Sequence, residues 1–166
     1  MVAKDFEQFV ASQQTDLDAS ADRAQIVDEW LQNLRLLYEE IAGFLHEFVS
    51  TGSISFGFTK IEINEPELGT YLADRMDIII GRQHVSLIPV GTLLVGCKGR
   101  VDVQGSSGQT ELLLLKRGAK GASDLASGDR DGEPWTWKIV SNTIPRQFVE
   151  LDRELFFELV MQVANA

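Results

Sequence analysis

The feature that most constrains the fold is an apolar repeat in the segment 23–49. Its main members recur at alternating spacings of four and three residues, and they are Val27, Leu31, Leu34, Tyr38, Ile41, Leu45 and Phe48. A spacing that averages about 3.5 residues places these side chains on one face of an α-helix. Trp30, Leu37 and Phe44 widen that face. The segment therefore predicts a long amphipathic helix that ends near Gly52, which can supply a left-handed C-cap.

The width of the apolar face indicates what this helix packs against. A broad stripe rich in aromatic residues is typical of a helix that lies across a sheet. The competing interpretation is a coiled coil, including a homodimer through residues 23–49, because a heptad repeat is also the coiled-coil pattern. We favour packing within the chain, since the stripe is broader than a coiled-coil seam.

The residues before this helix predict a second, shorter helix. Phe6, Phe9 and Val10 fall on one face of a helix over residues 4–13. The stretch Thr15 to Asp22 is polar and rich in Asp and Ser, which are residues of turns and helix caps. We therefore expect a connection there between two N-terminal helices.

From Ser53 onward the apolar period changes to two, which predicts strands. The apolar residues change parity between Phe58 and Ile61, and this indicates a β-bulge near Thr59 and Lys60. Short turn sequences separate the apolar runs, so the strands are expected to be antiparallel neighbours. Residues 53–140 thus predict a meander sheet of about six strands.

The C-terminal third contains three further segments. Residues 116–134 hold four glycines and few apolar side chains, which predicts a flexible loop. The last strand is expected at Trp135 to Val140, and Asp152 can cap a C-terminal helix within residues 150–164. We interpret the chain as one α+β domain spanning 1–166, with helices in 1–50, the sheet in 53–140 and a terminal helix.

Charge and composition narrow the classes of function. The chain has 15 basic and 25 acidic residues, and ten acids against three bases lie in residues 1–50. A net charge of −10 repels phosphate backbones, so we expect no nucleic-acid partner. An acidic helical surface can instead dock a basic protein. The apolar stretch from Val85 to Val95 is far shorter than the ~20 residues of a membrane span, so no membrane association is expected.

Residue types that carry chemistry are sparse. Cys97 is the only cysteine, which excludes an internal disulfide and indicates a reducing, cytoplasmic setting. With His46 and His84 as the only histidines, the sequence predicts no closed zinc site, and no cofactor motif is present. Cys97 is expected to be a small buried strand residue.

Carboxylates within the predicted strands offer an enzymatic alternative. Asp77, Asp102 and Glu111 lie in or next to apolar strand segments, and paired carboxylates on adjacent strands can hold a divalent metal for hydrolysis. The lysine spacing of metal-dependent nucleases is missing, so the simpler interpretation is that these side chains alternate toward solvent.

By elimination, the sequence favours a non-catalytic protein-interaction module that binds through the acidic helical face or the sheet. Its candidate binding residues are Asp28, Glu29, Glu39, Glu40, Glu47, Trp135 and Trp137. The alternatives are a metal-assisted hydrolase that uses the strand carboxylates and a small-ligand sensor with a pocket between helix and sheet.

Overall fold

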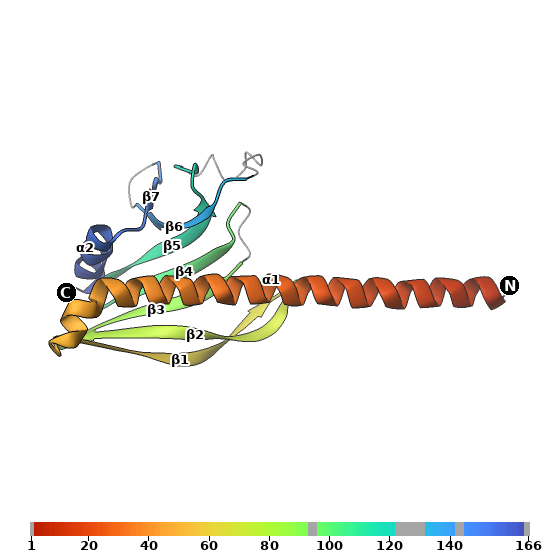
Figure 1. Ribbon diagram of the computed structural model, residues 1–166, viewed down its shortest axis with the longest axis horizontal. Coiled ribbons are helices and arrows are strands. Elements are labelled where there is room, and N and C mark those ends of the chain that lie inside the picture. Colours follow the sequence, from red (N-terminus) through yellow and green to blue (C-terminus); the bar gives the residue numbers. More distant parts are fainter. Residues whose placement is uncertain (1, 93–95, 122–131, 142–144, 165–166) are drawn as a thin grey trace.

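The computed structural model describes residues 2–92, 96–121, 132–141 and 145–164. In these residues a long helix precedes seven strands, and a short helix follows them (Figure 1). The elements are α1 (Val2–Ser50), β1 (Ile54–Glu65), β2 (Gly69–Ile80), β3 (Gln83–Gly91), β4 (Gly99–Gly105), β5 (Gly108–Lys116), β6 (Trp135–Val140), β7 (Phe148–Glu150) and α2 (Arg153–Ala164).

The strands form one antiparallel meander in the order β1-β2-β3-β4-β5-β6-β7, which confirms the predicted α+β class. Two tight turns are found where the sequence predicts them, one after Ile80 and one between Gly105 and Gly108. The sheet has one strand more than expected. The additional strand, β7, has only three residues, too few to show an alternating pattern in the sequence.

Helix α1 is continuous over 49 residues, so the predicted connection at Thr15–Asp22 is wrong. That stretch contains no Gly or Pro to interrupt a helix. Its polar side chains bond within the helix instead of competing with it: Thr15 Oγ1 donates to the Ala11 carbonyl over 3.0 Å. The helix ends as predicted at Gly52, which has a φ of 80°. There the Ser53 N–H donates to the Phe48 carbonyl over 2.9 Å, as in a Schellman motif.

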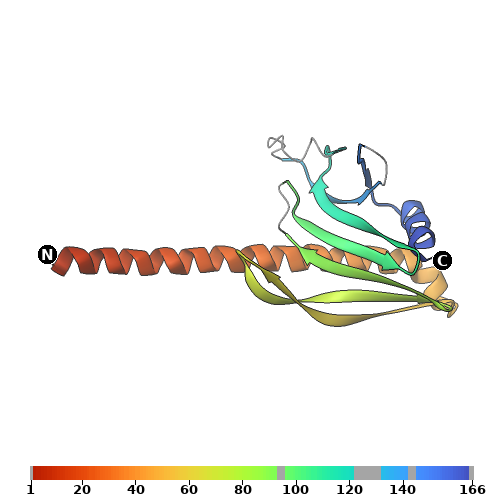
Figure 2. The ribbon, with the colours of Figure 1, turned by 180° about the vertical axis from the view of Figure 1, so that it is seen from behind.

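The C-terminal half of α1 lies across one face of the sheet, with α2 beside it on the same face (Figures 1 and 2). The rings of Trp30 and Trp137 of β6 are tilted by 45° with centroids 6.1 Å apart, and the ring of Phe44 lies 5.9 Å from that of Phe156 of α2. Packing within the chain is therefore confirmed, and the apolar face that a coiled coil through residues 23–49 would need is already covered. The buried side chains of α1 are Trp30, Leu34, Leu37, Tyr38, Ile41 and Leu45.

The N-terminal half of α1 extends far beyond the sheet (Figure 1). At about 1.5 Å per residue the whole helix is about 74 Å long, which is much longer than any strand. The part from Val2 to Val27, which we call the protruding segment, contains apolar residues that face solvent, and Phe6 is 64% exposed. This segment accounts for much of the apolar surface that the chain leaves uncovered.

The outer parts of β1 and β2 form a two-stranded ribbon, because β3 pairs only with Met76–Ile80 of β2. The β1–β2 register is unbroken from Ile54 opposite Ile80 to Glu65 opposite Gly69, so the predicted bulge is wrong. Two-stranded ribbons twist more strongly than wide sheets. The ribbon twists along its length (Figure 2). Ile54 is buried near the start of β1, and near its end the twist buries Ile63, which lies on the opposite face of the strand.

Most of the predicted flexible loop, residues 122–131, lies outside the described residues. Its described flanks are bonded to the sheet. The Arg117 N–H donates to the Pro134 carbonyl over 3.0 Å, and Lys138 Nζ donates to the Arg117 carbonyl over 2.6 Å. Asp152 caps α2 as predicted, since its Oδ1 accepts from the Leu155 N–H over 2.8 Å.

The packing of α1 predicts a contrast between two leucines on the same helix. Leu34 is 2% exposed and Leu36 is 49% exposed. We expect Leu34→Ala to lower the free energy of unfolding by about 2–5 kcal/mol, because it leaves a cavity between helix and sheet. Leu36→Ala is the matched control and should change it by about 0.5 kcal/mol or less. Urea titration followed by circular dichroism measures both, and equal losses would contradict this packing.

Candidate functional site

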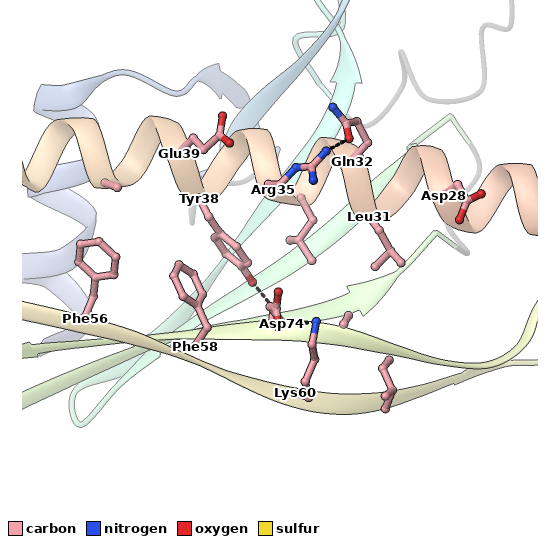
Figure 3. A pocket seen from close by; sticks show the side chains of 14 residues that line it. Asp28, Leu31, Gln32, Arg35, Tyr38, Glu39, Phe56, Phe58, Lys60 and Asp74 are labelled. Carbon is pink, nitrogen blue, oxygen red and sulfur yellow. Dashed lines mark hydrogen bonds and ion pairs between the residues drawn. The ribbon is translucent and has the colours of Figure 1, made fainter.

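A groove with a volume of about 670 Å³ lies between α1 and the β1–β2 ribbon (Figure 3). Its apolar lining comes from Leu31, Leu34, Tyr38, Ala42, Phe56, Phe58, Leu72 and Ala73. Phe58 and Leu72 are 50% and 58% exposed, which leaves the groove open to solvent along the ribbon. The groove is thus an accessible apolar surface and not a closed cavity.

A tyrosine fixes the width of this groove. The Tyr38 hydroxyl reaches across from α1 and donates to the Asp74 carbonyl over 2.6 Å (Figure 3). Its ring lies 5.4 Å from that of Phe58. Burial raises the pKa of Tyr38 well above its usual range, so the hydroxyl remains a hydrogen-bond donor at neutral pH. This contact holds helix and ribbon at a constant separation.

Charged residues surround the apolar floor. Asp28, Arg35 and Glu39 project from α1 along one side. Lys60 of β1 pairs with Asp74 of β2 over 2.9 Å on the other side. An apolar floor with a polar rim is the usual anatomy of a protein-binding surface.

The five predicted acidic binding residues do not form one continuous surface of unpaired carboxylates. Asp28 and Glu39 lie on the groove rim. Glu29 pairs instead with Lys98 over 3.2 Å, and a hydrogen bond from that lysine lowers the pKa of Glu29. Glu47 pairs with Arg153 of α2 over 3.2 Å. The ion pairs therefore occupy two of the five carboxylates and leave the groove side of α1 as the better candidate.

Glu40 lies on the other side of α1, in a cleft of about 230 Å³ that Trp135 and Trp137 also line. Desolvation and, second, the nearby charge of Glu150 raise the pKa of Glu40. Trp137 is 8% exposed and belongs to the core. Trp135 is half-buried, and Lys116 Nζ lies over its ring 4.8 Å from the centroid. The two tryptophans thus contribute mainly to packing.

The strand carboxylates are on the sheet face opposite the helices, and Asp77 lies apart from the other two. Arg75 Nε donates to Asp77 over 2.9 Å, Ser86 Oγ over 2.8 Å, and His84 Nε2 lies 3.1 Å away. Burial by itself would raise the pKa of Asp77, but these three hydrogen bonds outweigh it and hold the pKa below its usual value. All three contacts are to the Oδ1 atom of Asp77.

Asp102 and Glu111 face each other across β4 and β5. Arg100 lies between them, at 2.8 Å from Asp102 and 3.6 Å from Glu111, and Arg146 is 3.8 Å from Glu111. The guanidinium groups occupy the place where a metal ion would bind a carboxylate pair. Within the described ranges, no group of three or more His, Cys, Asp or Glu side chains is arranged to hold a metal ion.

Cys97 is buried, as the sequence predicts, in a small apolar cluster with Leu115 and Phe148. Its thiol lies 2.9 Å from the Gly99 carbonyl, and burial raises the pKa of Cys97. A raised pKa keeps the thiol protonated and poorly nucleophilic.

Sequence reasoning missed a buried carboxylate, Glu65, at the end of β1. It is 1% exposed and accepts from the Thr92 N–H over 2.8 Å and from the Tyr71 hydroxyl. These bonds join the tip of the ribbon to the chain that leaves β3. In the sequence Glu65 precedes Pro66 in a predicted turn, so nothing local distinguishes it from an exposed turn residue. Its role in the structure is to clamp the ribbon.

Comparisons with protein-family models, with curated proteins and with solved structures found no match. Neither described helix combines the length and the apolar character that crossing a membrane requires.

The clamp at Glu65 predicts a stability effect at Gly91. Gly91 has a φ of 141°, and a Cβ there would lie 2.7 Å from the Glu65 carboxyl carbon. We expect Gly91→Ala to lower the free energy of unfolding by about 1–3 kcal/mol through backbone strain and this clash. The loss should be smaller in a Glu65→Ala background, because that change removes the clash. Gly43→Ala, with open space around its Cβ, is the control and should not destabilise.

The hydrogen bonds to Asp77 predict a pH effect. Since its folded pKa lies below the 3.8 of an ordinary aspartate, its contribution to stability is complete above that pH. The contribution is lost as the pH falls through the folded pKa. Asp77→Asn should therefore reduce the loss of unfolding free energy on acidification. Urea titrations between neutral pH and about pH 2 measure this, and an unchanged pH profile would exclude Asp77 as a contributor.

Proposed function

We propose that this protein is a protein-interaction module whose binding surface is the groove between α1 and the β1–β2 ribbon. The observation that carries the proposal is the groove itself, an accessible apolar surface that the fold leaves uncovered. Exposed apolar surfaces framed by polar residues are typical of sites that bind other proteins. In this proposal the partner contributes apolar side chains to the groove floor.

The rim charges support a preference for basic residues in the partner. Asp28 and Glu39 lie on the α1 side of the groove without an ion pair among the contacts described above, whereas Asp74 is paired with Lys60. Together with the net charge of −10, these carboxylates favour the approach of a positively charged segment. Charges at a rim mainly affect the association rate and its salt dependence.

A small-ligand sensor is the second candidate, because a volume of about 670 Å³ falls within the usual range of ligand pockets. Such pockets enclose most of their ligand. Here the lining residues Phe58 and Leu72 remain about half exposed, which suits the side of a protein segment better than an enclosed molecule. The metal-assisted hydrolase receives no support, since arginines occupy the strand carboxylates.

The proposal predicts position-dependent crosslinking to a protein. A photo-reactive amino acid at Leu72, on the groove, should yield a discrete protein adduct in cells of the native source. Ile79 is the control position, because it lies on the same strand, is 47% exposed and is absent from the groove lining. No adduct is expected there. Gel electrophoresis and mass spectrometry identify and quantify the adducts.

Charge reversal sharpens the same experiment. Glu39→Lys should lower the adduct yield several-fold, because it reverses a rim charge. Glu40→Lys adds the same charge one residue further on, in the cleft on the other side of α1, and should have little effect. Equal yields from positions 72 and 79 would contradict the proposal. A bound small molecule in native mass spectrometry, with no protein adduct, would favour the sensor.

A further inference from the structure

The protruding segment, Val2–Val27, presents an apolar stripe on which none of the described residues of the chain packs (Figure 1). The exposed apolar side chains on this stripe are Val2, Phe6, Phe9, Val10 and Leu17. Ile26 is also exposed, but it is nine residues from Leu17 and so points to the opposite side of the helix. A single helix in water is marginal without a partner for its apolar face. A stripe of this length on a helix that leaves the body of the protein therefore requires an explanation.

The stripe lies on the same side of α1 as the groove. At about 3.6 residues per turn, 18 residues make about five full turns, so residues 18 apart point in the same direction. Leu17 is thus aligned with Arg35 of the groove rim. Phe6 is aligned with Ala24 and, a further 18 residues along, with Ala42 of the groove lining. The stripe and the groove therefore form one continuous surface along the same side of α1, which we call the track.

We infer that this track is occupied by the protruding segment of a second copy of this chain, in antiparallel orientation. The inference rests on the proposed function, because it names an occupant for the outer end of the groove. A second protruding segment has the complementary form: a long helix with apolar residues along one side. A two-fold axis makes the same surface serve both copies.

The orientation follows from the position of the ribbon. A parallel second helix lying on the stripe would continue along the track and run into the β1–β2 ribbon, which forms the other wall of the groove. An antiparallel helix brings only its protruding segment to the same place, while its own sheet lies at the opposite end of the pair. The antiparallel arrangement therefore pairs the two stripes and keeps the two sheets apart.

Charge complementarity sets the register. Asp16 and Arg23 are seven residues apart, about two turns, and so lie on the same flank of the stripe. A two-fold axis close to Ser20 brings Asp16 of each copy opposite Arg23 of the other, which makes two favourable pairs. In this register Phe6 reaches the level of Asn33, between Leu31 and Arg35 at the end of the groove.

The first test is the state of association. Sedimentation equilibrium of the full chain should give twice the 18.5 kDa mass of one copy at micromolar concentration. Phe6→Asp with Leu17→Asp should weaken association at least about 100-fold, because it places charges in an apolar interface. Ala11→Asp with Thr15→Asp adds the same charges on the opposite side of the helix and should change it little. A monomer of wild type at about 100-fold higher concentration would overturn the inference.

The second test is the relative direction of the two helices. In a Cys97→Ser background, Ser20→Cys lies close to the two-fold axis and should form an intermolecular disulfide readily. Gln13→Cys lies two turns away on the same side of the helix, opposite residue 26 of the other copy. Its two sulfurs are then about 20 Å apart at about 1.5 Å per residue, so it should not crosslink. A parallel pair would crosslink at both positions with similar yield, and that result would overturn the antiparallel arrangement.

The third test concerns the groove and separates this inference from the proposed function. Leu72→Asp should weaken self-association about tenfold if Phe6 of the second copy reaches the groove. An unchanged dissociation constant would exclude the second copy from the groove and leave it to another partner. Conversely, a crosslink from position 72 only to this same chain, lost in Phe6→Asp, would support the inference and contradict the binding of a different protein.

Discussion

The contact on which the rest of the structure depends is the burial of the C-terminal half of α1 against the sheet. Leu37 and Ile41 are fully buried there, and Trp30 contacts Trp137. Burial of each large apolar side chain contributes roughly 1.5–3 kcal/mol, so this face outweighs any single polar contact in the molecule. It also fixes the rotation of α1 about its own axis. The groove then lies on one side of α1, the tryptophan cleft lies on the other, and the protruding segment extends from the end.

The ion pairs and hydrogen bonds contribute less to stability than this apolar packing, but they decide which carboxylates are free. Most charged groups near the sheet are paired with their neighbours, as Asp77 is with Arg75 and Asp102 is with Arg100. Exposed ion pairs contribute little to stability, on the order of 0–1 kcal/mol. Their consequence for function is that they occupy carboxylates which, as free groups, could bind a metal or a basic partner. The Tyr38 and Glu65 contacts are instead partly or fully buried and hold the ribbon against the helix and against β3.

One helix thus serves two purposes with one apolar repeat. Where the sheet is present, from Trp30 to Leu45, the repeat is buried within the chain. Where the sheet ends, the repeat continues into solvent at Leu17 and Phe6. The proposed binding groove and the proposed antiparallel pair both follow from this mismatch in length between helix and sheet. Apolar surface that the fold does not cover is available for association.

Local patterns in the sequence determined the elements themselves. The repeat from Val27 to Phe48 specifies the helix and its buried face, the glycine turns specify the hairpins, and Asp152 specifies the start of α2. Each of these signals acts between residues close in the chain. Tertiary structure decided the rest. The ribbon turns its other face inward because a two-stranded pair twists, and the groove exists because Phe58 and Leu72 are brought opposite α1. These outcomes depend on contacts between distant residues, whose free energies no local pattern contains.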